Sequence, residues 1–159
     1  MGLPNAPTDG PSLKARALRW LSQREYSRHE LRTKLLYAAG DSADAAAIEA
    51  LLDQLVEQGH LSDARFVESR VHARHARFGN RRIELELRRH GLSPDDQLQQ
   101  QLRTSELARA REVWRKKFNG RQATDAAGRA KQARFLAARG FSAEVVRRIV
   151  SNDREDESE

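Results

Sequence analysis

Arginine forms the most pronounced chemical pattern in this sequence of 159 residues. Between residues 70 and 82, in RVHARHARFGNRR, five arginines occur without an acidic residue. Guanidinium groups donate hydrogen bonds in a planar fork that suits phosphates and carboxylates, and helical spacing repeats that donor along one face. A solvated basic face, whose arginine stems cover the edge of the core, is the alternative interpretation. We expect a binding surface, formed by Arg70, Arg74, Arg77, Arg81, Arg82, Arg88, Arg89, Arg115, Lys116 and Lys117.

No group of residues has the pattern of a catalytic centre. The absence of cysteine excludes a thiolate nucleophile and a disulfide framework, and no glycine-rich phosphate loop with its lysine is present. Glu68, His72 and His75 fall within two helical turns but lack a second ligand cluster, so we expect no metal. Asp95 and Asp96 most simply favour the start of their own helix. The sequence therefore predicts a binding protein, not an enzyme, without a cofactor.

The charge of the chain is unevenly distributed. The net charge is +6, but the last nine residues, SNDREDESE, contain five acids and one base, so residues 1–150 carry +10. A body that basic attracts polyanions such as nucleic acid, or an acidic protein surface. The acidic tail is interpreted as a solubilising end, and the alternative is that it competes with a polyanion for the basic surface.

Helices must position these side chains, because strand-length alternation is absent and apolar residues recur at helical spacing. The pattern predicts an all-α chain of about nine helices. Ser27 and Glu30 form the signature of a capping box, with Tyr26 and Leu31 able to pack over it. A short sixth helix is expected after Ser93, followed by a separate seventh over residues 106–118.

A recurring Gly-x-Ser motif divides the helices into groups. Gly40, Gly91 and Gly140 each precede a serine by two residues, at intervals of 51 and 49 residues, and a leucine lies four residues before each glycine. Glycine can close a helix in the left-handed conformation, and serine can cap the next one. Chance recurrence is the alternative to a repeat. We expect three tandem three-helix repeats in an elongated, curved array, at 13–61, 62–102 and 103–150, between a disordered arm at 1–12 and an acidic disordered tail at 151–159.

The sequence also predicts the cellular location and the oligomeric state of the protein. No apolar run reaches the length of a membrane span, and MGLPNAPTDGPS lacks the features of a signal peptide, which predicts a cytoplasmic protein. A monomer is expected, because no long heptad seam is evident.

Three segments together resemble one protein family. YSRHELRTKL, LVEQGHLSDARFVESRVHAR and FGNRRIELELRRHGLS are similar, in this order, to motifs of the RecX family of bacterial recombination regulators, and the similarity extends from about Leu13 to Val150. The sequence departs from the family at Ser62, where Asp is frequent, and at Val67, where Ala is frequent. The third repeat is weak in these motifs.

The resemblance implies a partner and an activity. The partner is the RecA recombinase filament on single-stranded DNA, in whose helical groove such a protein binds. No membrane is expected to take part. The implied activity is to limit filament growth, ATP hydrolysis, strand exchange and co-protease activity toward LexA. The resemblance therefore implies a role in the regulation of DNA repair, homologous recombination and the SOS response. Charge reversal at Arg74 and Arg77 is expected to weaken inhibition of ATP hydrolysis.

Two other function classes remain open on the sequence. IEALLDQLVEQGHLSDARFV is compatible with a helix-turn-helix transcriptional regulator, although no β-hairpin wing follows it. A nuclease requires a cluster of acids for metal ions, which the basic regions lack.

Overall fold

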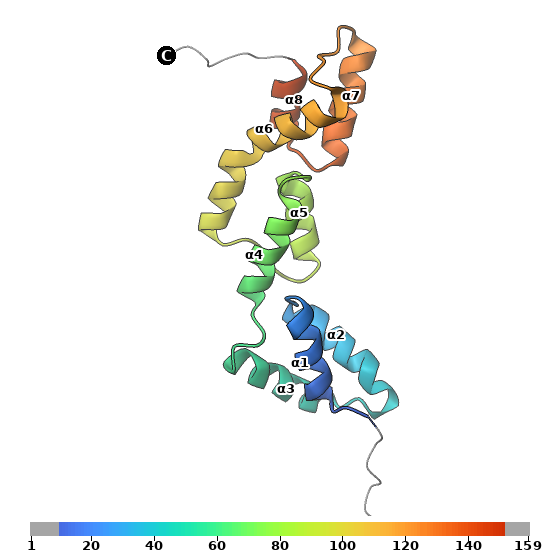
Figure 1. Cartoon of the computed structure of the whole chain (residues 1–159), viewed down its shortest axis with the longest axis vertical. Helices are drawn as coiled ribbons and strands as arrows, with labels where there is room; N and C mark the ends of the chain where they lie inside the picture. Colours follow the sequence, from blue (N-terminus) through green and yellow to red (C-terminus); the bar gives the residue numbers. More distant parts are fainter. Residues whose placement is uncertain (1–9, 152–159) are drawn as a thin grey trace, which may run out of the picture. The chain divides into compact units, whose positions relative to one another are not determined.

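Helices joined by turns make up the part of the chain that the structure describes (Figure 1). The computed structural model describes residues 10–151, so most of the predicted arm (1–12) and tail (151–159) lies outside the described residues. No strand occurs between residues 10 and 151, and the all-α prediction is confirmed. The helices are α1 (Leu13–Gln23), α2 (Arg28–Ala39), the short 3-10 helix η1 (Gly40–Ser42), α3 (Ala45–Glu57), α4 (Asp63–Arg74), α5 (Asn80–Arg88), α6 (Asp96–Phe118), α7 (Ala126–Ala138) and α8 (Ala143–Val150).

The predicted cap of α2 is present. The Ser27 hydroxyl oxygen accepts a hydrogen bond from the Glu30 N–H at 3.0 Å, and the side chains of Tyr26 and Leu31 are buried. The cap satisfies a backbone donor that would otherwise have no partner at the start of the helix, and is worth about 1 kcal/mol.

The Gly-x-Ser motif correctly predicts positive φ at its three glycines, but only one of its three serines caps the helix that follows. Gly40, Gly91 and Gly140 all have positive φ angles, of 56°, 70° and 88°, which favour glycine, although the ψ angle of Gly40, −132°, lies outside the left-handed helical region. Ser142 caps α8 by accepting from the Val145 N–H, but Ser42 lies in η1, and Ser93 precedes Asp95, which caps α6. The capping role expected of Ser93 was therefore wrong. Aspartate caps a helix as well as serine does, and its charge is favoured at a helix N-terminus.

The prediction of separate sixth and seventh helices was also wrong. A single helix, α6, covers both, which leaves eight α-helices in the described range of 10–151. Thr104 and Ser105 lie where the break was expected, but their hydroxyls donate to the carbonyl oxygens of Gln101 and Leu102, three residues earlier, at 3.1 and 3.3 Å. The two hydroxyls thus bond back to the turn that precedes them instead of capping a new helix.

The chain divides into two compact units, of which the first ends at Phe66. Its core contains buried side chains from α1, α2 and α3, including Leu31, Leu35 and Leu52. Arg28 of α2 donates to Glu49 and Asp53 of α3 at 2.9 and 2.7 Å, and its backbone N–H donates to the Asp63 carboxylate at 2.8 Å. These ion pairs connect α2 to α3 along the edge of the core.

The second unit begins at Val67 and contains the rest of α4 together with α5 to α8. Helices α6, α7 and α8 pack around a core that includes Ala110, Leu136, Phe141 and Ile149. Ile83 and Leu87 are buried on α5, which packs against α6. All ten of the predicted arginines and lysines lie in this unit.

Candidate nucleic-acid interface

A cleft rich in arginine lies in the second unit, where the end of α4, α5 and the end of α7 come together. Its volume is about 620 Å³. We call it the basic cleft, and its lining consists of Arg74, Arg77, Phe78, Arg81, Arg82, Leu85, Glu86, Arg89, Ala138 and Gly140. Five guanidinium groups and one carboxylate therefore surround a single depression.

Phe78 supports the arginines of the basic cleft. The Arg82 guanidinium carbon lies 4.1 Å from the centroid of the Phe78 ring, and those of Arg77 and Arg139 lie at 5.5 and 5.6 Å. Cation–π attraction of this kind is worth about 0.5–1 kcal/mol at exposed sites. The ring therefore restrains cations whose mutual repulsion would otherwise separate them.

Two glycines allow the backbones on either side of the basic cleft to approach closely. The Gly79 N–H donates to the Arg139 carbonyl oxygen at 2.9 Å, and the Arg81 N–H donates to the Gly140 carbonyl oxygen at 3.1 Å. A Cβ atom on Gly79 would lie 2.2 Å from the Phe141 nitrogen, and one on Gly140 would lie 2.4 Å from the Arg82 Cβ. Only glycine fits at these two positions, which hold the start of α5 against the turn between α7 and α8.

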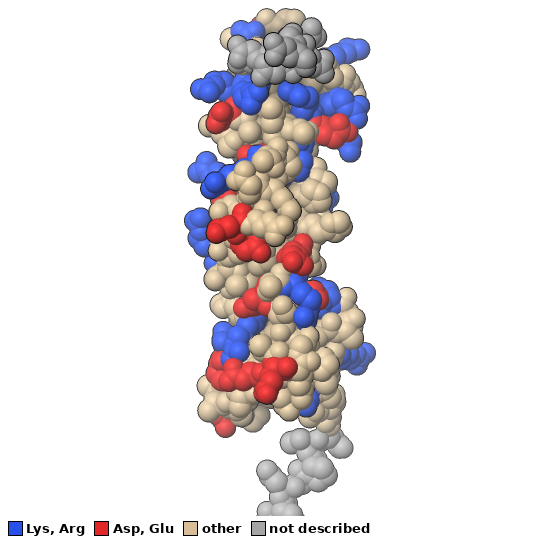
Figure 2. Space-filling view, turned by 90° about the vertical axis from the view of Figure 1, so that its left-hand side faces the viewer, with Lys and Arg blue, Asp and Glu red and all other residues tan. Residues whose placement is uncertain are grey.

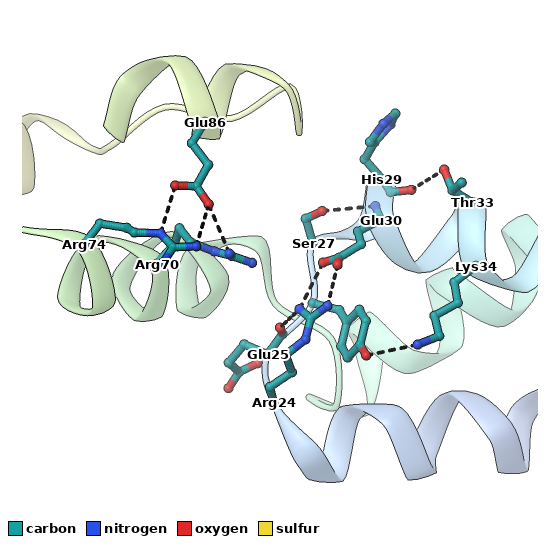
Figure 3. A network of polar contacts seen from close by, with 11 residues as sticks. Arg24, Glu25, Ser27, His29, Glu30, Thr33, Lys34, Arg70, Arg74 and Glu86 are labelled. Carbon is teal, nitrogen blue, oxygen red and sulfur yellow. Dashed lines mark hydrogen bonds and ion pairs between the residues drawn. The ribbon is translucent and has the colours of Figure 1, made fainter. Parts of the chain in front are cut away.

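Glu86 neutralises part of the charge (Figure 3). Its carboxylate oxygens accept from Arg70 Nη1 at 3.0 Å and from Arg74 Nε at 3.1 Å, and all three side chains are largely buried. Within residues 10–151, no acid forms an ion pair with Arg77, Arg81, Arg82 or Arg89. The basic cleft thus has four arginines available to an anion.

Two polar residues of α6, the buried Glu106 and the half-buried Arg109, support the helices of the basic cleft and were not predicted from the sequence. The Glu106 carboxylate accepts from the backbone N–H groups of Asn80 and Ser142, at 3.3 and 3.1 Å, and so holds the N-terminal ends of α5 and α8 together. Arg109 donates to the carbonyl oxygens of His75 and Phe78, at 2.9 and 3.0 Å. Burial lowers the pKa of the Arg109 guanidinium. The signal available in the sequence was an acid and a base three positions apart on the apolar side of α6.

The predicted site residues fall into separate groups. The basic cleft brings together Arg74, Arg77, Arg81, Arg82 and Arg89, and Arg70 pairs with Glu86 behind it. Arg88 is exposed on α5 but does not line the basic cleft. The remaining three are Arg115, Lys116 and Lys117, in the last turn of α6.

The last turn of α6 has its own local contacts. Glu112 forms ion pairs with Arg115 at 2.6 Å and with Lys116 at 3.9 Å, and hydrogen bonding to Arg115 lowers the pKa of the Glu112 carboxyl. Lys117 Nζ lies 5.5 Å from the centroid of the Phe135 ring. On the face of the second unit that is drawn in Figure 2, basic side chains gather around α7 and α8.

His72 and His75 lie beside a smaller pocket of about 270 Å³, together with Glu68 of α4 and residues of α6. The two imidazole ring centroids are 5.7 Å apart, and His75 Nδ1 is within 2.9 Å of the His72 carbonyl oxygen. Among residues 10–151, no three His, Asp or Glu side chains are grouped so that they could hold a metal ion.

The geometry favours electrostatic binding of an extended anion. Arginines from two helices and the turn between them converge without a nearby acid other than Glu86, so successive phosphates of a nucleic-acid strand can receive bidentate hydrogen bonds. Within the described range, no helix is long and apolar enough to cross a membrane. The fold and the basic cleft thus define a class: all-helical proteins with a cationic cleft.

Comparison with known proteins identifies the family within this class. Residues 62–103 match the family model described as RecX, second three-helix domain, and residues 104–150 match RecX, third three-helix domain. The chain is 51% identical to "Regulatory protein RecX" of Herminiimonas arsenicoxydans, over 92% of this chain and 95% of that protein. It is likewise 51% identical to "Regulatory protein RecX" of Ralstonia nicotianae, over 94% of this chain and 91% of that protein. This chain therefore belongs to the RecX family.

The fold is shared with a solved structure of a distant relative. The crystal structure of RecX from Lactobacillus salivarius matches with a TM-score of 0.71 and 19% sequence identity, over 88% of this chain and 93% of that one. At this identity the match supports the fold alone.

Proposed function

We propose that this protein is a non-enzymatic regulator that binds the RecA filament on single-stranded DNA. Binding inhibits the recombinase, ATP-hydrolysing and co-protease activities of the filament, and so regulates DNA repair, homologous recombination and the SOS response. Membership of a family of proteins named regulatory protein RecX supports the proposal. The protein acts in the cytoplasm as a monomer with three repeats, at 13–61, 62–102 and 103–150.

The observation that carries the proposal is the set of four unpaired arginines around the basic cleft. A surface ion pair within one protein contributes little, but guanidinium groups that lack a local acid can release counterions from a nucleic acid when they bind its phosphates. In this mechanism the four unpaired arginines of the basic cleft, Arg77, Arg81, Arg82 and Arg89, contact the DNA backbone within the filament. Such contacts position the protein without reading the base sequence.

ATP hydrolysis by RecA on single-stranded DNA tests the proposal. Sub-stoichiometric amounts of this protein are expected to reduce the hydrolysis rate. The double variant Arg77→Glu/Arg89→Glu changes two exposed, unpaired residues of the basic cleft, and it is expected to require at least tenfold more protein for the same inhibition, a change of about 1.4 kcal/mol. Full inhibition by this variant would show that the basic cleft does not contribute to inhibition of RecA.

A matched control separates the basic cleft from net charge. Arg88→Glu/Arg103→Glu reverses the same number of charges at exposed positions outside the basic cleft, and it is expected to inhibit almost as well as the unchanged protein. Sequence-specific binding of duplex DNA at moderate salt, without an effect on RecA, would instead favour a helix-turn-helix transcriptional regulator.

A further inference from the structure

A second depression lies on the other side of Arg81, between α7 and α8. Its volume is about 640 Å³, and small or aliphatic side chains form its floor. We call it the alanine groove, and its lining consists of Arg81, Arg129, Ala130, Ala133, Arg134, Ala137, Phe141, Ala143, Val146, Arg147, Val150 and Ser151. The lining contains four arginines and no acid, and Arg81 also lines the basic cleft.

The floor of the alanine groove has the geometry of a helix-packing surface. Ala130, Ala133 and Ala137 are spaced i, i+3 and i+7 along α7, so they lie on one face of that helix. Val146 and Val150 are one turn apart on α8. Alanine side chains let a second helix approach closely, toward the lower end of the usual 8–10 Å between helix axes. Ala130 and Ala137 are nevertheless exposed in this structure.

The rim of the alanine groove indicates the charge of its occupant. Arg134 and Arg147 are exposed, and neither forms an ion pair with an acid between residues 10 and 151. They stand on α7 and α8 beside the apolar floor. A ligand that fills the alanine groove therefore needs apolar groups in its centre and acidic groups at its edges.

Two other occupants fit less well. Single-stranded nucleic acid would contact the rim arginines through its phosphates, but its bases would find no exposed aromatic ring on the apolar floor, because Phe141, the one aromatic residue in the lining, is 3% exposed. The acidic end of this chain, SNDREDESE, contains no apolar residue that would match the apolar floor.

We infer that the alanine groove binds an amphipathic helix of a partner protein, with aliphatic side chains against Ala133 and Val146 and carboxylates against Arg134 and Arg147. This is the helix-in-groove mode of peptide recognition. The alanine groove then serves protein, whereas the basic cleft serves DNA phosphates. The two sites share Arg81, so one elongated partner assembly can engage both.

Two synthetic peptides test the inference with the full chain. The first has leucines at i, i+3, i+4 and i+7 with glutamates on both flanks of that stripe, and the second has the same composition with the leucines scattered around the helix. Binding is followed by changes in the amide NMR signals of the isotopically labelled protein. The first peptide is expected to shift the signals of Ala130, Ala133, Ala137 and Val146, with an affinity at least tenfold that of the second.

A variant in the alanine groove provides the second arm. Ala137→Asp places a carboxylate on the exposed floor, and it is expected to weaken binding of the first peptide at least tenfold. Ala108→Asp is the matched control, because Ala108 is exposed on α6 outside the alanine groove. A short oligothymidine is expected to shift signals of the basic cleft and to bind both variants alike.

Three outcomes would overturn the inference: equal binding of the two peptides, unchanged peptide binding by Ala137→Asp, and oligothymidine binding that centres on Ala133 and Val146. The last outcome would make the alanine groove a nucleic-acid site. None of these measurements contains RecA, so their failure is distinct from failure of the proposed function.

Discussion

Glu86 controls how much positive charge the basic cleft presents. Its carboxylate accepts hydrogen bonds from Arg70 and Arg74, so both guanidinium groups already have a partner. The substitution Glu86→Gln retains the shape of the side chain and removes its charge. We expect single-stranded oligothymidine to bind this variant about three to tenfold more tightly, which corresponds to roughly 1 kcal/mol, because Arg74 becomes available to phosphate.

Fluorescence anisotropy across a salt series measures this effect. Glu84→Gln is the matched control, since Glu84 lies on the same helix and forms no ion pair with a basic side chain in residues 10–151. An unchanged affinity for Glu86→Gln, or an equal gain for Glu84→Gln, would contradict a counter-ion role for Glu86.

Glu49 makes the stability of the first unit depend on acidity. Hydrogen bonds from Arg32 and then Arg28 lower the pKa of the Glu49 carboxyl from 4.5 to about 2. The folded state therefore binds this proton less readily than the unfolded state does. The resulting stabilisation is complete above pH 4.5 and is lost as the pH falls toward 2.

Thermal unfolding between pH 2 and pH 6 checks this prediction. Glu49→Gln is expected to lower the melting temperature near pH 6 and to flatten its decline with acidity. Glu57→Gln, at an exposed position near the end of the same helix, is the control and is expected to leave the profile unchanged. Identical pH profiles for Glu49→Gln and the unchanged protein would show that the ion pairs of Glu49 have no net effect.

At the scale of elements, a close contact of backbones positions the basic cleft. Gly140 and Gly91 both have positive φ, but a Cβ atom on Gly140 would lie 2.4 Å from the Arg82 Cβ, whereas one on Gly91 would have nothing within 4 Å. Gly91→Ala is expected to cost only the backbone strain of about 1–2 kcal/mol. Gly140→Ala is expected to cost roughly 1–3 kcal/mol more, because it overpacks the contact with α5.

Thermal unfolding of both variants, with oligothymidine binding measured well below the melting temperatures, separates stability from site geometry. Gly140→Ala is expected to weaken binding as well as stability, since Arg82 must move. Gly91→Ala is expected to bind normally once folded. Equal stability of the two variants would mean that the turn between α7 and α8 does not hold α5.

Local rules predicted the helix ends better than the helix breaks. The positive φ angles of Gly40, Gly91 and Gly140 depend on one residue each, and the sequence predicts them correctly. The break expected near Ser105 depended on a competition between capping a new helix and bonding back to the old one. The outcome was decided by tertiary packing, because Leu102 and Glu106, on either side of that position, are both buried in the second unit.

At the scale of the molecule, the sequence predicted a basic surface but not the ion pairs that its arginines form within the chain. Five of the ten predicted cations line one cleft, because α4, α5 and the turn between them concentrate arginine within twenty residues. The pairing of Glu86 with Arg70 and Arg74 joins positions 12 to 16 residues apart, and it exists only once α4 and α5 pack together. A helical pattern relates residues three or four positions apart, so it does not reveal contacts between residues 12 to 16 positions apart.

The salt dependence of DNA binding measures how many cations act together. Each phosphate neutralised on a single strand contributes about −0.7 to the slope of log K against log salt concentration, so four free arginines predict a slope of about −3. Arg77→Glu/Arg89→Glu is expected to reduce the magnitude of this slope by at least about 1.4, because two of those contacts are lost. Arg88→Glu/Arg103→Glu weakens long-range attraction but removes no contact of the basic cleft, so its slope is expected to stay near −3. If instead both double variants reduce the slope equally, binding depends on the net charge of the whole chain and not on the basic cleft.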